Sequence, residues 1–508
     1  MHRALRSSVA ALAIAVASAA VLLIRPDAAF AKSLADYEWL EVRSANFTVY
    51  SATGEKKAAQ LVRNLEYFRE AVGLVSNLSS TDSYVPTRVY LIPNTQSIVE
   101  LGMDANVAGF IQPTQRDYRI VVRDVKGMSE TLIVLHEYAH FVIRNHNGLQ
   151  YPPWFDEGFA EYLGSSRLRG QYFKVGLANE DRAYALSNGI WLPMRSILRI
   201  KGDYGDWTDR QIGMFYAQSW ALVHYLQVEM ADEIDFTAAL ARYLELADED
   251  LPGDEAFEAA FGLDPDELNR ALRRYLEGGR FGYLNIKADA LLADFDYSVQ
   301  PVAVEAVALG LADIAAGLDA TENARALYDL AAQAPRSAGE ARLRSALLSA
   351  TDSLPALEED FDSALALCPN NPFCQLDYAR YLSRRANAEP ERRAEWIARA
   401  REHYVKAWSL DDTIPEVYAR YGKSFLTADI DVSKAVEMLE EAQYLLSSNL
   451  QIRYQLGRAY AAARRSEEAR EALHSVVVWS HSDSRIARKA KALLTRLDEL
   501  EQGPESTE

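Results

Sequence analysis

One short pattern in the sequence combines residue types that bind metal ions. The pentapeptide 136–140, His-Glu-Tyr-Ala-His, places two imidazoles four residues apart and a carboxylate beside the first. On an α-helix, four residues advance the chain by about 400° and ~6 Å, so both imidazoles face the same point. This H-E-x-x-H arrangement predicts one Zn²⁺ held by His136 and His140, with Glu137 as the general base. Two histidines on a buried helix face can also be purely structural, so the pattern needs a third ligand to support it.

Two downstream residues compete for the place of the third ligand. Glu157 lies in the acidic and aromatic segment 154–161, shortly after a Pro-Pro pair, and His146 has the spacing of H-E-x-x-H-x-x-G-x-x-H. That second scheme needs glycine at the eighth position for a sharp turn, and Ile143 stands there instead. On a continuous helix His146 lies six residues past His140, about 600° round, and points away from the metal. We therefore favour Glu157, and a metzincin-type site with His146 stays the alternative.

The pattern lies among elements that could position it. Residues 37–50 alternate as a strand does, residues 54–76 have helical spacing, and Asn147-Gly148 ends the helix that carries the two histidines. Pro152-Pro153 suits the start of a further helix. The remaining predicted elements are strands at 88–92 and within 107–122, and helices at 129–144, 152–163 and 208–230. A sheet therefore precedes the metal pattern, which indicates an α+β domain.

The segment around Glu157 carries a family resemblance. Trp-Phe-Asp-Glu-Gly-Phe-Ala at 154–160 resembles the Trp-Leu-Asn-Glu-Gly-Phe-Ala segment that holds the third zinc ligand in the aminopeptidase branch of the gluzincins. The resemblance assigns Glu157 to that role and implies one Zn²⁺ per chain. Thermolysin-like gluzincins place a further carboxylate four residues later, and Glu161 has that spacing. It is thereby implied to orient one zinc-binding imidazole, although a solvated helix charge is the plain alternative.

A second resemblance concerns a tyrosine. Residues 215–222, Phe-Tyr-Ala-Gln-Ser-Trp-Ala-Leu, resemble the helix that in the same branch supplies a tyrosine hydroxyl to the tetrahedral intermediate. Tyr216 is the matching position, but Gln218 and Ser219 stand where the family often has Lys and Gly, and a core aromatic is a serious rival interpretation. The segment 108–112 lacks the glutamate with which that branch binds a free amine, which favours endopeptidase over aminopeptidase action.

The chain changes character after about residue 290. Ala, Leu, Arg and Glu dominate, strand patterns disappear and turn residues recur, which indicates helical repeats. Gly422 and Gly457 lie 35 residues apart, and Pro372 precedes Pro415 by 43 residues, with an insertion around 387–393. These helix-turn-helix units resemble tetratricopeptide repeats, and an unrelated helical bundle is the alternative.

Two cysteines lie close together in this helical region. Cys368 and Cys374 bracket the sequence Pro-Asn-Asn-Pro-Phe. In an exported protein a local disulfide is favoured over two free thiols. The pair lacks the further Cys or His that a zinc knuckle requires, so we expect a structural role only.

The N-terminus predicts export. A basic start, an Ala-rich apolar run and Ala29-Phe30-Ala31 have the order of a cleavable signal peptide over residues 1–31. The protein is then periplasmic or secreted, although an uncleaved anchor is the alternative. The formal charge of -19 becomes -21 without this segment, whose Arg3, Arg6, Arg25 and Asp27 sum to +2. Such acidity argues against nucleic-acid or anionic-membrane partners.

The complete pattern is similar to bacterial peptidase MA-like proteins that join a gluzincin domain to tetratricopeptide repeats. The resemblance implies an α+β zincin-like peptidase domain at 32–288, an all-α repeat domain at 289–500 and a disordered tail at 501–508. The implied activity is zinc-dependent peptide-bond hydrolysis on a peptide or protein substrate, with the edge strand around 118–122 as the expected place for an extended substrate. The alternative is a catalytically weak or inactive peptidase-like domain that serves as an interaction scaffold, with a protein partner on the repeats.

Overall fold

A computed structural model describes residues 32–502 except 79, 106, 125–129, 147–150, 201–206, 249–250, 350–356, 429–430 and 481–483. The predicted signal peptide and most of the predicted tail lie outside these residues. The chain forms two compact units, each built from separate stretches of sequence. The first comprises Met1–Arg63, Ser83–Glu130 and Asp296–Ala472, and the second comprises Asn64–Asp82, Thr131–Phe295 and Leu473–Glu508. The linear division at residue 288 stays a prediction.

The first unit contains a six-stranded mixed sheet in the order β4-β5-β3-β2-β1-β9. Its strands are β1 (Trp39–Arg43), β2 (Phe47–Ser51), β3 (Thr87–Ile92), β4 (Gly109–Pro113), β5 (Tyr118–Arg123) and β9 (Ser298–Val302). β3 runs parallel to both β2 and β5, and the other neighbours are antiparallel. The predicted strands at 88–92 and within 107–122 are confirmed. The single strand expected over 37–50 is wrong, because the chain turns at 44–46 and forms the hairpin β1-β2.

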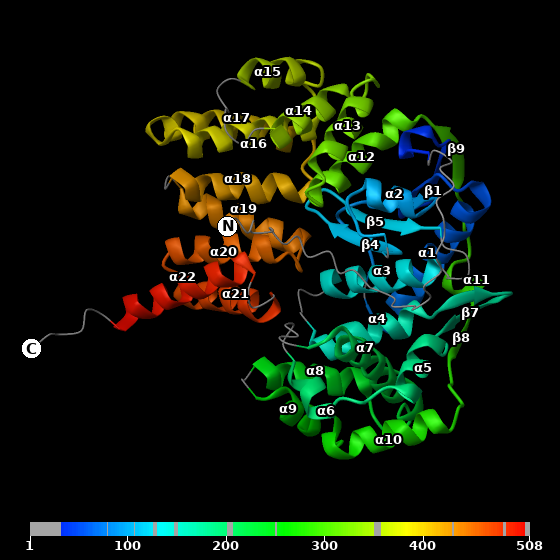
Figure 1. The fold of residues 1–508 in the computed structure, drawn as a ribbon. Coiled ribbons are helices and arrows are strands. Elements are labelled where there is room, and N and C mark those ends of the chain that lie inside the picture. The colour runs from blue at the N-terminus through cyan, green and yellow to red at the C-terminus, as the bar shows by residue number, and fades with distance from the viewer. Residues whose placement is uncertain are drawn as a thin grey trace, which may run out of the picture. The chain divides into compact units, whose positions relative to one another are not determined.

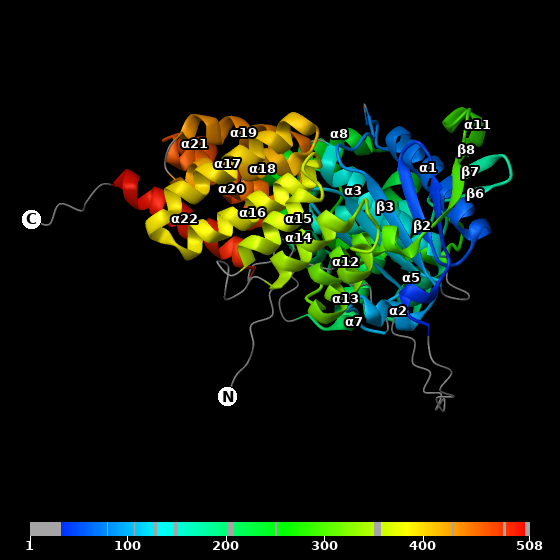
Figure 2. The ribbon, with the colours of Figure 1, turned by 90° about the horizontal axis from the view of Figure 1, so that it is seen from above.

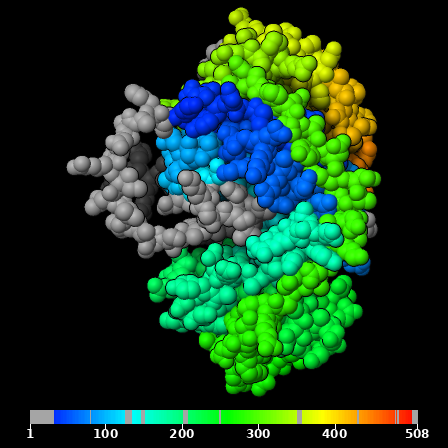
Figure 3. All heavy atoms as spheres, turned by 90° about the vertical axis from the view of Figure 1, so that its right-hand side faces the viewer, coloured from blue at the N-terminus to red at the C-terminus, as the bar shows by residue number. Residues whose placement is uncertain are grey.

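Two expectations about the sheet are corrected. Strand structure does not end at residue 290, because β9 pairs antiparallel with β1 at the edge of the sheet. Pro301 obscured this strand, since proline is tolerated in a sheet only at edges or bulges. Figure 3 shows this face, with the green chain around β9 beside the blue N-terminal chain. The segment 118–122 is not an edge either, because β5 lies between β3 and β4, and β4 is the edge strand.

Helix pairs follow the sheet within the same unit. α12 and α13 bury Val307, Leu311 and Leu327 in one apolar core with Trp39 and Tyr90 of the sheet. Later pairs stack through a second core, and in Figure 1 they follow one another from green to orange; Figure 2 shows the same stack from above. The helices are α12 (Val304–Gly317), α13 (Thr321–Ala331), α14 (Ala338–Ser349), α15 (Glu358–Ala366), α16 (Pro372–Ala388), α17 (Arg393–Leu410), α18 (Pro415–Ala428), α19 (Val432–Leu445) and α20 (Leu450–Ala462). The helical repeat region is thus a series of antiparallel pairs.

Short elements complete this unit. They are η1 (Leu34–Asp36), α2 (Thr95–Glu100) and η4 (Pro390–Arg392). A disulfide joins Cys368 to Cys374 across the turn from α15 to α16. α1 (Glu55–Val75) and α21 (Ser466–Trp479) each contribute residues to both units.

The second unit is mostly helical and contains the metal pattern. Its helices are α3 (Glu130–His146), α4 (Pro153–Gly164), α5 (Glu180–Asn188), α6 (Met194–Arg199), α7 (Asp209–His224), α8 (Phe236–Asp248), α9 (Gly253–Phe261), α10 (Pro265–Glu277), α11 (Ala288–Leu291) and α22 (Arg485–Gln502), and α7 continues into a π-helical turn at Tyr225–Glu229. β6 (Arg167–Arg169), β7 (Tyr172–Val175) and β8 (Leu284–Lys287) form a small antiparallel sheet. Within the described part of the chain, no helix is both long and apolar enough to cross a membrane.

Candidate metal centre

The side chains of the H-E-x-x-H pattern on helix α3 are buried. His136, Glu137 and His140 are 4%, 1% and 1% exposed, although each carries a polar group that water would solvate. The intervening Tyr138 packs its ring on Phe68 of α1. Polar side chains are kept in so apolar a place only when partners satisfy them. The partners come mainly from the next helix.

Helix α4 begins where the Pro-Pro pair predicts, with Pro153 in its first turn. Its Trp154 lies edge-on to the rings of Tyr243, Phe257 and Phe261, which anchors the start of the helix. Gly158 has a direct structural reason, because a Cβ atom there would collide with the backbone carbonyl of Ser219 on α7. The glycine therefore lets α4 and α7 approach closely, and this approach fixes the helix that carries Glu157.

Three side-chain atoms from α3 and α4 converge on one point. The Nε2 atoms of His136 and His140 lie 3.2 Å apart. Glu157 Oε2 lies 3.6 Å from the first and 3.3 Å from the second. Among the described residues these three form the group of His, Cys, Asp or Glu side chains that could hold a metal ion. The predicted ligand set is therefore brought together in space.

The separations suit a zinc ion. A tetrahedral Zn²⁺ with ligands at about 2.0–2.1 Å requires donor atoms about 3.3–3.4 Å from one another. The three observed separations, 3.2, 3.3 and 3.6 Å, lie close to that value. Two imidazoles and one carboxylate are also the donor set of catalytic zinc sites, which leave the fourth position open. The residues present thus fit a zinc ion in both chemistry and spacing.

Each histidine has a carboxylate on its far side. Nδ1 of His140 lies 3.1 Å from Asp156, whose other partner is Arg144. Nδ1 of His136 lies 3.7 Å from Glu161, which accepts hydrogen bonds from Arg182 and Asn179. Such outer partners fix the tautomer and the orientation of metal-binding imidazoles.

Glu161 was predicted beside one of the histidines, whereas Asp156 was not. Asp156 directly precedes the proposed ligand Glu157, and Arg144 lies four residues after His140, on the same face of α3. An acidic residue beside the ligand, matched by an arginine one turn beyond the second histidine, was the pattern that could have revealed this contact.

The centre carries more negative than positive charge. Glu157 and Asp156 have lowered pKa values: burial alone would raise both, but His140 and, for Asp156, Arg144 outweigh it. Burial would lower the pKa of His140, but Asp156 and Glu157 raise it to about 10. Burial raises the pKa of Glu137. Four carboxylates, those of Glu137, Asp156, Glu157 and Glu161, face two guanidiniums, those of Arg144 and Arg182. Without a metal, protonated His140 supplies one further positive charge; with the neutral imidazoles that metal binding requires, two negative charges remain. A divalent cation supplies that balance.

The structure places the remaining candidates less directly. Tyr216 is half-buried on α7, and the guanidinium of Arg182 lies 5.5 Å from its ring centroid. Arg182 therefore contacts both Tyr216 and Glu161, and the catalytic role of Tyr216 stays a prediction. His146 ends the continuous helix α3, and its side chain lies outside the described part of the structure.

No protein-family model matches the sequence, and no curated protein matches it. A thermophilic TPR protein of Thermus thermophilus, TTC0263, matches with a TM-score of 0.33 and 16% identity over 38% of this chain and 99% of that one. The Cut9–Hcn1 hetero-tetramer of the APC/C matches at 0.31 and 15%, over 56% and 48%. Yeast Tom70 matches at 0.31 and 14%, over 76% and 77%. The repeat character of α12–α20 rests on the packing of this chain's own helix pairs.

Proposed function

We propose that this protein is a zinc-dependent peptidase of the gluzincin type. The observation that carries the proposal is the convergence of His136 Nε2, His140 Nε2 and Glu157 Oε2 at tetrahedral spacing. The net charge of the surrounding side chains supports it, since a divalent cation neutralises them. The neighbouring Glu137 supports hydrolysis over a purely structural metal, because a structural site needs no spare carboxylate beside its ligands.

The chain's own residues divide the chemistry among them. A zinc ion held by His136, His140 and Glu157 would lower the pKa of a water molecule to about 7 and would polarise a carbonyl group. Glu137 accepts a proton on a carboxylate oxygen as the water oxygen attacks the peptide carbon, and it delivers that proton to the leaving nitrogen when the C–N bond breaks. Asp156 and Glu161 keep the imidazoles oriented through Nδ1. Tyr216 is proposed to donate its hydroxyl proton in a hydrogen bond to the developing oxyanion.

Hydrolysis of an unstructured protein tests the proposal. Zinc-loaded protein is incubated with reduced casein, and new amino groups are counted. We expect Glu137→Gln to lower the rate by about 10²–10⁴-fold while the protein retains its zinc. Glu245→Gln, on the exposed face of α8 in the same unit, is the matched control and should keep the full rate. Equal rates for Glu137→Gln and the unmodified protein would refute the general-base role, and no hydrolysis by any form would refute the peptidase proposal.

A second candidate function concerns the helical repeats. Their stacked helix pairs, α12 to α20, favour a role as a protein-interaction scaffold, because stacked repeats build extended concave binding surfaces. This role does not require the metal centre to be active. It can therefore coexist with peptidase activity or replace it.

A further inference from the structure

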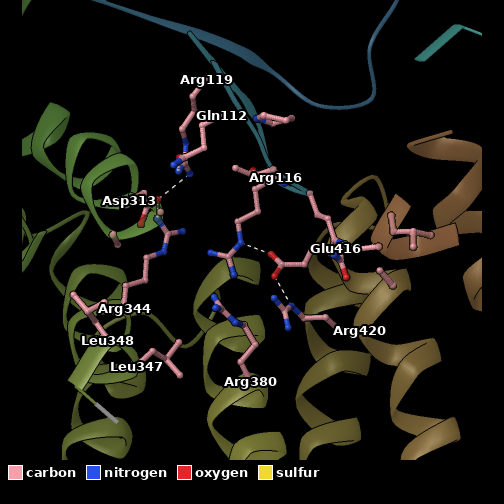
Figure 4. A pocket seen from close by; sticks show the side chains of 18 of the residues that line it. Gln112, Arg116, Arg119, Asp313, Arg344, Leu347, Leu348, Arg380, Glu416 and Arg420 are labelled. Carbon is pink, nitrogen blue, oxygen red and sulfur yellow. Dashed lines mark hydrogen bonds and ion pairs between the residues drawn. The ribbon is translucent and has the colours of Figure 1, made fainter. Parts of the chain in front are cut away.

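The first unit contains a cavity of about 920 Å³ at the helical repeats. One wall is the β4-β5 hairpin, with Gln112, Arg116 and Arg119. The other wall consists of helices α12, α14, α16, α18 and α20, the first helix of each pair, together with Tyr328 of α13. Figure 4 shows guanidinium groups from the hairpin and from successive helices turned toward one another in this space. The volume lies within the range of ligand-binding pockets, about 300–1,000 Å³.

The lining residues recur with the helical repeat. Arg344, Arg380, Glu416 and Ile452 all line the cavity, and each follows the previous one by 36 residues. One helical turn later, Arg384 and Arg420 line it as well and are again 36 residues apart. Helices α14, α16, α18 and α20 thus present the same face to the cavity. Repeats of this kind can offer a row of similar contacts to an extended ligand.

The cavity holds more cations than the nearby carboxylates neutralise. Among the described residues, six arginines line the cavity: Arg116, Arg119, Arg344, Arg380, Arg384 and Arg420. A seventh, Arg88, shares Asp117 with Arg119. The carboxylates paired with them are Asp117, Asp313, Glu340, Asp377 and Glu416. Seven guanidiniums therefore share five carboxylates. This excess stands out in a chain whose formal net charge is -19.

The excess positive charge is concentrated at Arg380 and Arg384. Arg384 donates to the backbone carbonyl of Leu347, and Arg380 shares Asp377 with Arg116 and Arg344. Burial lowers the pKa of both Arg380 and Arg384, and the guanidinium of Arg420 lowers each further. Their positive charge is thus disfavoured in this structure. A bound anion would relieve that cost, and guanidiniums match carboxylates in a two-pronged geometry.

Other lining groups favour a peptide over a small inorganic anion. The side-chain amides of Gln451 and Gln455 line the end of the cavity at α20, and Leu347, Leu348 and Ile452 add apolar surface. Amides hydrogen-bond to peptide groups, and apolar surface contacts side-chain methylenes. A single phosphate would meet one or two guanidiniums and leave most of the volume unfilled.

We propose that this cavity binds an acidic peptide segment, in which several carboxylates bind the arginines of successive helices. The proposal rests on the scaffold role of the repeats and supplies the chemistry of the partner. It is independent of the metal centre, because every residue in it belongs to the first unit.

Fluorescence anisotropy with the purified full chain tests the proposal. The probe is a fluorescein-labelled peptide of six glutamates, and the reference probes are hexaglutamine, hexalysine and a labelled single-stranded DNA. We expect saturable binding of hexaglutamate that weakens as salt rises, with at least tenfold weaker binding of hexaglutamine. Arg384→Gln should weaken hexaglutamate binding by about tenfold or more, because it removes one charge-assisted hydrogen bond.

Two further variants keep the test decisive if Arg384→Gln misfolds. Gln455→Glu keeps the acceptor that Arg458 uses and adds a negative charge to the cavity, so it should also weaken hexaglutamate binding. Arg325→Gln, on an exposed site of α13 away from the cavity, should bind as the unmodified protein does.

Several results would overturn the proposal. Equal binding of hexaglutamine would mean a peptide groove without selection for acid, and so would retain the scaffold role alone. Binding of no peptide at all by folded protein would remove both. Competition by 1 mM inorganic phosphate, or binding of DNA at similar strength, with no effect of Arg384→Gln or Gln455→Glu, would show that the charge recognition lies elsewhere.

Discussion

The metal centre and the arginine-lined cavity handle buried charge in opposite ways. At the metal centre, four carboxylates face two guanidiniums, so with the neutral imidazoles that metal binding requires the side chains lack two positive charges. At the cavity, seven guanidiniums share five carboxylates, so the side chains lack negative charge. Burying unbalanced ions costs several kcal/mol each. We propose that each place takes a ligand of opposite sign, a dication in one and an acidic peptide in the other.

The largest effect is expected from removing the charge of Asp377, the buried carboxylate that three arginines of the cavity share. Asp377 is fully buried and pairs with Arg116, Arg344 and Arg380. Asp377→Asn leaves these guanidiniums without their shared charge, so we expect the free energy of unfolding to fall by about 3–5 kcal/mol. Urea unfolding followed by circular dichroism measures this. The control is Glu468→Gln, an exposed partner of Arg465, which should change stability by less than about 1 kcal/mol. Similar losses in both variants would contradict a buried anchor.

Low pH should weaken the ion pairs that Asp377 and Glu416 form with these arginines. Burial would raise the pKa of Asp377 and of Glu416, but Arg116 and its neighbours lower both far below their ordinary values. Since the folded state then binds fewer protons than the unfolded state, the stabilisation is complete above about pH 4, the ordinary carboxyl pKa, and is lost as the pH falls below it. Metal-free protein should therefore unfold at lower urea at pH 3 than at pH 6. The stability of Asp377→Asn should depend less on pH than that of the unmodified protein. An equal pH dependence would contradict the role of Asp377 in the acid sensitivity.

At the metal centre, a smaller and graded effect is expected from the outer carboxylates. Asp156 lies 3.1 Å from its histidine and Glu161 lies 3.7 Å from its own. Asp156→Asn should therefore weaken zinc affinity by about 10–100-fold, the usual cost of losing such a partner, and Glu161→Gln should weaken it less. Competition with a chelator of known affinity measures both. The reverse order would show that the separation of carboxylate and imidazole does not decide how strongly each carboxylate supports the metal.

The three candidate ligands and Glu161 were predictable from the sequence, and Asp156 was not. His136 and His140 follow from the period of one helix. Glu157 was favoured because His146 points away from the metal on a continuous helix and because residues 154–160 resemble the gluzincin ligand segment. Asp156 is adjacent in sequence to Glu157, yet its contact with His140 depends on how closely α3 and α4 approach. Gly164 permits that closeness, because a Cβ atom there would lie only 3.1 Å from the Cβ atom of His136 on α3. How closely two helices pack cannot be inferred from the residue periodicity of one segment.

The sheet and the cavity both contain features that depend on contacts between residues far apart in the sequence. β9 is five residues long and contains proline, so only its pairing with β1, far away in sequence, identifies it as a strand. The arginines at 36-residue spacing belong to a repeat that the sequence does indicate. Their shared carboxylates, however, come from different helices, and the hairpin that faces them lies far earlier in the chain. The positive cavity follows from that long-range packing.

The zinc content of the purified full chain tests the central claim most directly. Mass spectrometry should find about one zinc per chain in the unmodified protein, in Glu137→Gln and in His146→Ala, and much less in Glu157→Ala, because only the last change removes a donor atom from the centre. Loss of zinc in His146→Ala with retention in Glu157→Ala would favour the metzincin-type site instead. A folded, unmodified protein that takes up no zinc after incubation with the ion would contradict the metal centre and leave the scaffold role as the account of this molecule.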